Sequence, residues 1–117
     1  MCVSFPVRFR VRGPEEALRM TGPAEIEAKT LDVGVGGLAF VTQYCLPFKT
    51  GLFIKIKLYK EDGAGQRNFF DPVSLEGEVR SAVTYTPQEY RIGIRFTQID
   101  ETEKDLVDRF VVSGLHL

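Results

Sequence analysis

The chain has 117 residues, 44% hydrophobic and 26% charged, which suffices for one domain, residues 1–117, with a continuous core. Its formal net charge of −1 excludes a broad positive field and so disfavours binding to DNA or RNA through their phosphates. No apolar run is long enough to span a bilayer, and no basic start followed by an apolar segment marks a signal peptide. We therefore expect a cytoplasmic protein that does not insert into membranes.

Alternating apolar and polar residues predict six β-strands, the first beginning at Phe5 and ended by Gly13-Pro14. The basic residues of this first segment share the face opposite its apolar set; they are Arg8, Arg10 and Arg12. After Gly13 the chain reads as a loop with one helical turn at Glu15–Leu18. The remaining predicted strands are Ala24–Val33, Leu38–Thr42, Leu52–Tyr59, Val73–Tyr85 and Tyr90–Thr97.

The last part of the chain changes periodicity. Asp100 and Glu103 have the spacing of a helix capping box, and an apolar stripe at helical spacing follows, formed by Leu106, Val107, Phe110 and Val111. Six short strands favour a closed barrel or a sandwich, because closure removes exposed strand edges. The predicted fold class is therefore all-β with one C-terminal helix. The connection 61–72 contains Asp62-Gly63 and is predicted to be a long hairpin connection.

The sequence offers little for catalysis or metal binding. Cys2 and Cys45 lack the spacing of a metal or redox site, and reduced thiols are the default without an export signal. His116 is the only histidine, so no nucleophile has a histidine base. The carboxylates on or near the later strands are most simply a solvated face; they are Asp71, Glu76 and Glu78. We expect neither an enzyme nor a protein with a metal or cofactor.

The stretch Leu31–Phe40 joins two apolar runs through three glycines and Asp32. On periodicity alone this is a turn that reverses the chain. An acidic residue just before such a turn can also cap N–H groups or accept hydrogen bonds from a ligand. A strand-like run follows the glycines, so a dinucleotide-binding fingerprint is not supported.

The segment 32–37, with the sequence Asp-Val-Gly-Val-Gly-Gly, resembles the D/N-x-S-x-x-G motif of PilZ domains, which are bacterial receptors for cyclic di-GMP. Other segments resemble the first strand, the late strands and the start of the closing helix of that family, in the same order: Phe5–Val11, Leu75–Val79, Tyr90–Phe96 and Ile99–Glu103. Each motif is weak alone, but together they cover nearly the whole chain. The resemblance implies a six-stranded antiparallel β-barrel with a C-terminal helix.

The resemblance also implies a ligand site. In the family, the acidic residue accepts hydrogen bonds from guanine N–H groups and the closing glycine permits close approach; Asp32 and Gly37 match these positions. Gly34 stands where the family has serine, which removes a hydroxyl partner worth about 0.5–1.5 kcal/mol, although its backbone N–H can partly compensate. The predicted cyclic di-GMP site therefore contains Asp32, Gly34 and Gly37.

PilZ domains that bind cyclic di-GMP also carry an R-x-x-x-R stretch before the first strand, whose arginines contact guanine edges and phosphates. Arg8 and Arg12 satisfy this string and complete the predicted site, but they lie within the predicted strand. The competing interpretation, which we favour, is a solvated strand face paired with Glu25 and Glu27. Charge-assisted contacts are roughly twice as strong as neutral ones, so the loss of the arginine pair costs more than the loss of the serine. We therefore expect weak or absent binding of cyclic di-GMP.

Three hypotheses for the function stay open. The first is a non-catalytic second-messenger domain that binds cyclic di-GMP weakly and relays the signal to a protein partner. The second is a degenerate adaptor that binds a protein through the helix stripe or through exposed aromatic residues such as Phe48, Phe69 and Phe70. The third is a structural barrel that forms a homo-oligomer through its closing helix.

Overall fold

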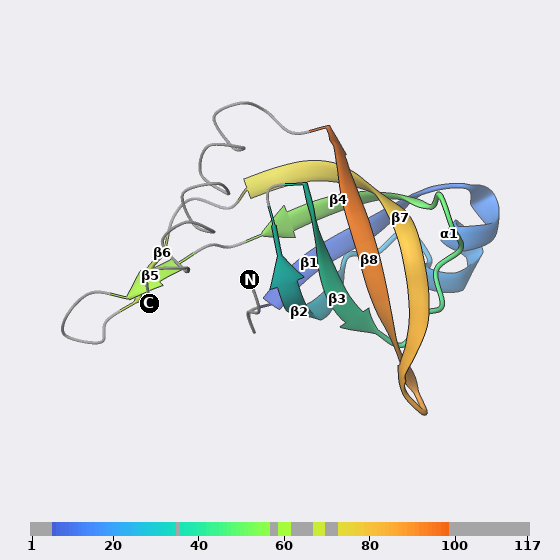
Figure 1. Cartoon of the computed structure of the whole chain (residues 1–117). Helices are drawn as coiled ribbons and strands as arrows, with labels where there is room; N and C mark the ends of the chain where they lie inside the picture. The colour runs from blue at the N-terminus through green and yellow to red at the C-terminus, as the bar shows by residue number, and fades with distance from the viewer. Residues whose placement is uncertain (1–5, 35, 57–58, 62–66, 70–72, 99–117) are drawn as a thin grey trace.

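The computed structural model describes residues 6–34, 36–56, 59–61, 67–69 and 73–98 (Figure 1). Within these ranges the elements are β1 (Pro6–Gly13), α1 (Glu15–Thr21), β2 (Ile26–Val33), β3 (Gly37–Thr42), β4 (Gly51–Ile56), β5 (Tyr59–Glu61), β6 (Arg67–Phe69), β7 (Val73–Thr86) and β8 (Glu89–Gln98). The predicted C-terminal helix falls outside the described residues.

Six of the strands form a closed barrel in the order β1-β2-β3-β8-β7-β4, in which β4 pairs again with β1. All of these pairings are antiparallel. The predicted six-stranded antiparallel barrel is confirmed. Figure 1 shows α1 beside one end of the barrel, while β5 and β6 form a separate two-stranded sheet beyond the other end.

The helical turn predicted after the first strand is a full element, α1. Glu15 and Arg19 form an i,i+4 ion pair at 2.9 Å on its exposed side, and Ala17 is buried against the barrel. The fourth predicted strand covers parts of two elements, because Ile56 belongs to β4 and Tyr59 belongs to β5 of the second sheet.

The barrel interior is filled by the apolar residue of each alternating pair. In β1 the burial pattern alternates strictly, which places Phe9 inside and the arginines outside. Phe9 stacks on Phe40 of β3 with ring centroids 4.9 Å apart. The largest fully buried side chains are Phe9, Phe40, Leu46, Leu52, Ile54, Ile56 and Ile92. The alternate residues of β1 are exposed on the outer wall, whereas β3 is buried from Leu38 to Thr42.

Candidate functional site

Asp32 lies on the outer wall of the barrel near the end of β2. A register shift between Thr30 and Asp32 marks a β-bulge in the pairing of β2 with β3, and Asp32 is paired with Ala39. The carboxylate residue is half-buried. Beyond β2 the chain turns, and the Gly34 N–H donates to the Gly37 carbonyl oxygen at 2.8 Å. The turn closed by Gly34 and Gly37 thus directly follows the strand end that carries Asp32.

Gly37 is required where β3 meets β8. A Cβ atom at this position would collide with the carbonyl oxygen of Ile94 and lie 3.1 Å from its carbonyl carbon. The two strands are held together here by a hydrogen bond of 2.9 Å from the Phe96 N–H to the Gly36 carbonyl oxygen. Only glycine permits so close an approach of two main chains. The glycine of the motif therefore has a structural role, whatever its role toward a ligand.

A hollow of about 450 Å³ opens on the wall formed by β2, β3, β8 and β7, and we call it the Asp32 groove. Its lining includes Asp32, Gly34, Gly37, Gly93, Arg80 and Arg91. Three of the five predicted ligand residues thus line one hollow. Gly93 is paired with Ala39, so the middle of the groove has a floor of small residues.

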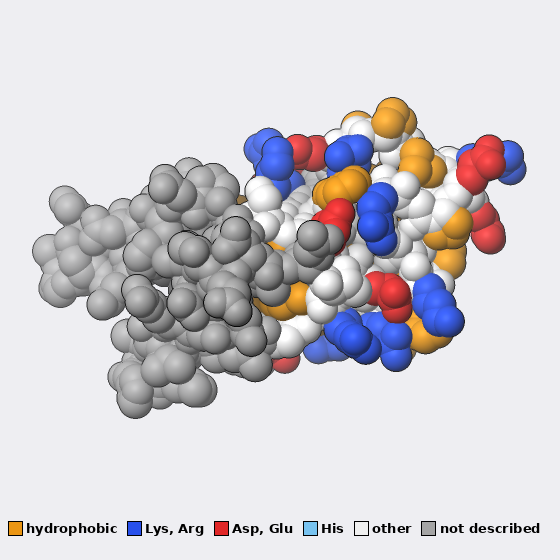
Figure 2. Space-filling model, turned by 90° about the horizontal axis from the view of Figure 1, so that it is seen from above, with side chains coloured by type: hydrophobic (Ala, Val, Ile, Leu, Met, Phe, Trp, Pro, Cys, Tyr) orange, Lys and Arg blue, Asp and Glu red, His pale blue; other side chains and the backbone are white. Residues whose placement is uncertain are grey.

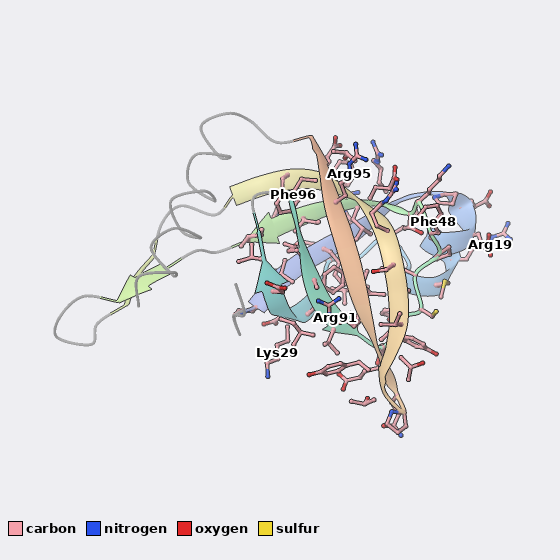
Figure 3. The ribbon with its side chains drawn as sticks, viewed as in Figure 1. Arg19, Lys29, Phe48, Arg91, Arg95 and Phe96 are labelled. Carbon is pink, nitrogen blue, oxygen red and sulfur yellow. The ribbon has the colours of Figure 1, made fainter. Side chains whose placement is uncertain are left out.

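Two arginines of this groove, Arg80 and Arg91, were missed by the sequence analysis. Arg91 lies on β8 at the register position of Val41, and Figure 3 shows it on the front of the barrel beside β3. Arg80 lies on β7, inside the bulge between Val79 and Ser81. The alternation of β8 predicts that Arg91 faces outward. It does not show that Arg91 lies near Asp32, because that requires knowing that β8 pairs with β3.

Arg80 has further contacts. Its Nη1 donates to Glu78 Oε1 at 3.0 Å, and its guanidinium lies 5.1 Å from the ring centroid of Phe48. The Phe48 side chain is 57% exposed. Arg80 therefore connects the Asp32 groove to an exposed aromatic ring.

Arg8 and Arg12 lie elsewhere. Arg8 lines a second hollow of about 490 Å³ on β1, β4 and β7, which we call the Arg8 hollow. Its charged and aromatic lining consists of Arg8, Arg10, Glu25, Phe53, Lys55 and Glu76. Arg12 Nη1 lies 3.9 Å from Glu76 Oε1. The structure therefore does not bring Arg8 and Arg12 to the carboxylate of Asp32.

The register of β1 and β2 explains this separation. Arg8 is paired with Glu27, and Asp32 lies five residues further along β2, which is about 16 Å at the rise of an extended strand. Arg12 lies further away still, because the strands are antiparallel. Of the two ends of β1, the Pro6 end is the nearer to Asp32. Residues 1–5, which precede it in the sequence, contain no arginine or lysine.

The predicted solvated face is present, with partly different partners. Arg8, Arg10 and Arg12 are exposed, and Arg8 is cross-strand from Glu27 as expected. Glu25, however, accepts a hydrogen bond of 3.0 Å from Lys55 Nζ, which lowers the pKa of the Glu25 carboxyl from its ordinary value of 4.5. The Arg10 guanidinium lies 4.5 Å from the Phe53 ring centroid.

The described residues contain no group of three or more His, Cys, Asp or Glu side chains that could hold a metal ion. No helix among them has the length and apolar character needed to cross a membrane. Cys45 is an exposed free thiol, and both Cys2 and His116 lie outside the described residues. Figure 2 shows basic, acidic and apolar side chains interspersed on the described part of the face seen from above.

A family model for the PilZ domain matches residues 4–113 of the chain. The chain belongs to the PilZ domain family. No curated protein sequence matches this PilZ domain.

Solved structures show the same fold at low sequence identity. The PilZ domain of CeSA from a cellulose-synthesizing bacterium has a TM-score of 0.58 and 18% identity, with 100% of this chain and 97% of that chain covered. A tetrameric PilZ domain protein from Xanthomonas campestris, self-assembled via a helical bundle, has a TM-score of 0.52 and 14% identity, with 86% and 51% covered. The PlzA protein of Borreliella burgdorferi, in complex with cyclic di-GMP, has a TM-score of 0.51 and 13% identity, with 95% and 45% covered. The chain thus spans about half the length of the last two proteins.

Proposed function

We propose that this PilZ domain is a cytoplasmic signalling domain that binds cyclic di-GMP weakly in the Asp32 groove and relays the signal to a protein partner. The observation that carries the proposal is the lining of the groove, in which one acidic residue and two arginines share a hollow with glycines and Ala39. A carboxylate accepts hydrogen bonds from guanine N–H groups, and a guanidinium donates to phosphate oxygens or to the acceptor edge of guanine.

The family supports the choice of ligand. PilZ domains are a family of cyclic di-GMP receptors, and the PlzA neighbour was solved as a complex with that nucleotide. The family is also generally non-catalytic, which agrees with a binding function rather than an enzymatic one.

Two departures from the family pattern point to weak affinity. Gly34 replaces the serine, so one hydroxyl contact is lost. In the register of β1 with β2, Arg8 lies about five residues from Asp32 along the strands and Arg12 lies further away. A net charge of −1 adds no long-range attraction for an anionic ligand.

The alternative is an adaptor that binds a protein and no nucleotide. The exposed ring of Phe48 favours this reading, because large exposed apolar side chains are common in docking surfaces. The other surfaces predicted for this role, the side chains of Phe69 and Phe70 and the C-terminal helix stripe, fall outside what the structure describes. Self-association is a third outcome, and the tetrameric Xanthomonas campestris neighbour makes it worth testing.

Calorimetric titration with cyclic di-GMP tests the proposal, with cyclic di-AMP as the matched ligand. Both ligands carry two phosphates, but adenine lacks the N1–H and 2-amino groups of guanine, from which Asp32 would accept hydrogen bonds. We expect micromolar binding of cyclic di-GMP that is lost in Asp32→Ala and retained in Glu25→Ala, since Glu25 lines the other hollow.

Absence of heat at high concentrations of cyclic di-GMP would contradict the receptor proposal and leave the adaptor. Equal binding of the two dinucleotides would contradict the role of Asp32 in guanine recognition. Sedimentation of the free chain addresses self-association, because a strictly monomeric species would eliminate the homo-oligomer.

A further inference from the structure

We infer that Arg91, with a smaller contribution from Arg80, supplies the positive charge of the Asp32 groove. These residues would contact the ligand in place of the arginine pair that precedes the first strand in related domains. This inference rests on the proposed function. It assigns ligand contacts to two residues that belong neither to the R-x-x-x-R string nor to the segment 32–37.

The first step is the location of the three charged groups. Asp32, Arg80 and Arg91 line the same hollow although they come from β2, β7 and β8. In the order of the barrel, β3 separates β2 from β8, and β7 follows β8. The carboxylate and the guanidiniums therefore stand on different sides of β3, which contributes the small residues Gly37 and Ala39 to the lining.

The second step is the availability of Arg91. In the part of the chain that the structure describes, no ion pair or side-chain hydrogen bond involves Arg91. Its side chain is half-buried, so part of its stem is already ordered against the barrel wall. A guanidinium without a protein partner can donate both arms of its fork to a phosphate oxygen pair.

Arg80 differs because it is already engaged. The 3.0 Å hydrogen bond to Glu78 neutralises part of its charge, and the Phe48 ring holds its guanidinium from another side. A ligand phosphate at Arg80 has to compete with the Glu78 carboxylate. We therefore assign the larger share of the binding to Arg91 and a smaller share to Arg80.

The third step is the match with the ligand. A guanine base offers N–H donors to the carboxylate, and the phosphates of the same dinucleotide offer anionic oxygens to the guanidiniums. The floor between them carries no side chain larger than the methyl of Ala39 at the pair formed by Ala39 and Gly93. A flat base can therefore lie against the wall between the two kinds of charge.

Titration of the whole chain with cyclic di-GMP tests the inference, using Arg91→Ala, Arg91→Lys and Arg80→Ala beside the controls Arg8→Ala and Arg12→Ala. We expect Arg91→Ala to weaken binding about tenfold or more, as for loss of a charge-assisted contact. Arg91→Lys should fall between the parent and Arg91→Ala, because lysine keeps the charge without the fork. Arg80→Ala should have a smaller effect, and the two controls should stay within about twofold.

A second readout separates a ligand contact from a structural role. Added salt should weaken binding less in Arg91→Ala than in the parent, because one screened charge pair is missing. Thermal unfolding of each variant checks that the barrel is intact. If Arg91→Ala does not fold, the comparison of Arg91→Lys with the parent gives the same information.

The outcomes distinguish the two proposals. Binding by the parent that is unchanged in Arg91→Ala overturns this inference and leaves the proposed function standing. Loss of binding in Arg8→Ala and Arg12→Ala, with Arg91→Ala unaffected, would show that the ligand contacts the R-x-x-x-R string and not Arg91. No binding by the parent overturns the proposed function, and this inference fails with it.

Discussion

The Asp32 groove and the Arg8 hollow lie on different parts of the outer barrel wall and arrange their charges differently. In the groove, the carboxylate is separated from the two guanidiniums by small residues. In the Arg8 hollow, acids and bases are close partners, with Lys55 3.0 Å from Glu25 and Arg10 stacked over Phe53. The basic residues of β1 therefore interact with side chains of neighbouring strands, whereas the charged residues of β2, β7 and β8 line the ligand site that we propose.

A glycine of the groove and a glycine beside Arg12 also differ in what they face, and this gives the largest expected effect. Gly37→Ala should destabilise the fold by about 3 kcal/mol, because the new Cβ meets the main chain of Ile94, which cannot move without opening the β3–β8 pairing. Gly51→Ala should cost less than about 1 kcal/mol. Its Cβ would lie 2.8 Å from the Arg12 guanidinium, the end of a flexible and 52% exposed side chain that can swing away.

Denaturant unfolding of the two variants measures this difference. Gly36→Ala is the control beside Gly37, because a Cβ there meets nothing within 4 Å. Equal destabilisation by Gly37→Ala and Gly36→Ala would show that the contact with β8 is not what requires glycine at position 37.

A smaller effect is expected at Thr30, which lies next to the bulge that precedes Asp32. Its side chain is fully buried, and its Oγ1 has no hydrogen-bond partner within the described ranges. Thr30→Val keeps the shape and removes the unsatisfied hydroxyl, so it should stabilise the fold by about 1 kcal/mol. Thermal and denaturant unfolding provide the measurement. Destabilisation by this variant would mean that the hydroxyl is satisfied in solution.

The smallest effect concerns the ion pair of the Arg8 hollow. The hydrogen bond from Lys55 lowers the pKa of Glu25 in the folded chain, so this contact stabilises the fold above pH 4.5 and is lost as the pH falls through the lowered pKa. Lys55→Met should return the Glu25 pKa toward 4.5 and should make stability less dependent on pH in this acidic range.

Carboxyl chemical shifts followed by NMR between pH 7 and pH 2 provide the measurement. The Glu27 carboxyl, two residues further along the chain in β2, is the internal control. An unchanged Glu25 titration in Lys55→Met would show that Lys55 does not form this contact in solution.

The strands and the barrel could be predicted from the sequence because alternation is a local property. Phe9 and its neighbours in β1 are buried and exposed as the pattern required. The pairing register is not local, and it decides which outward residues share a surface. For this reason the sequence offers Arg8 and Arg12 for the Asp32 site and gives no sign that Arg91, about sixty residues from Asp32, lines the same groove.

Closure of the barrel restricts how another protein can attach to it. Each of its six strands is hydrogen-bonded to a neighbour on both sides. An incoming chain therefore finds no barrel strand with a wholly unpaired edge, and β7 leaves one side unpaired by another described strand over residues 81–86. Recognition of this barrel through backbone hydrogen bonds is thus restricted to stretches such as that end of β7, and a partner on the paired part of the wall meets side chains.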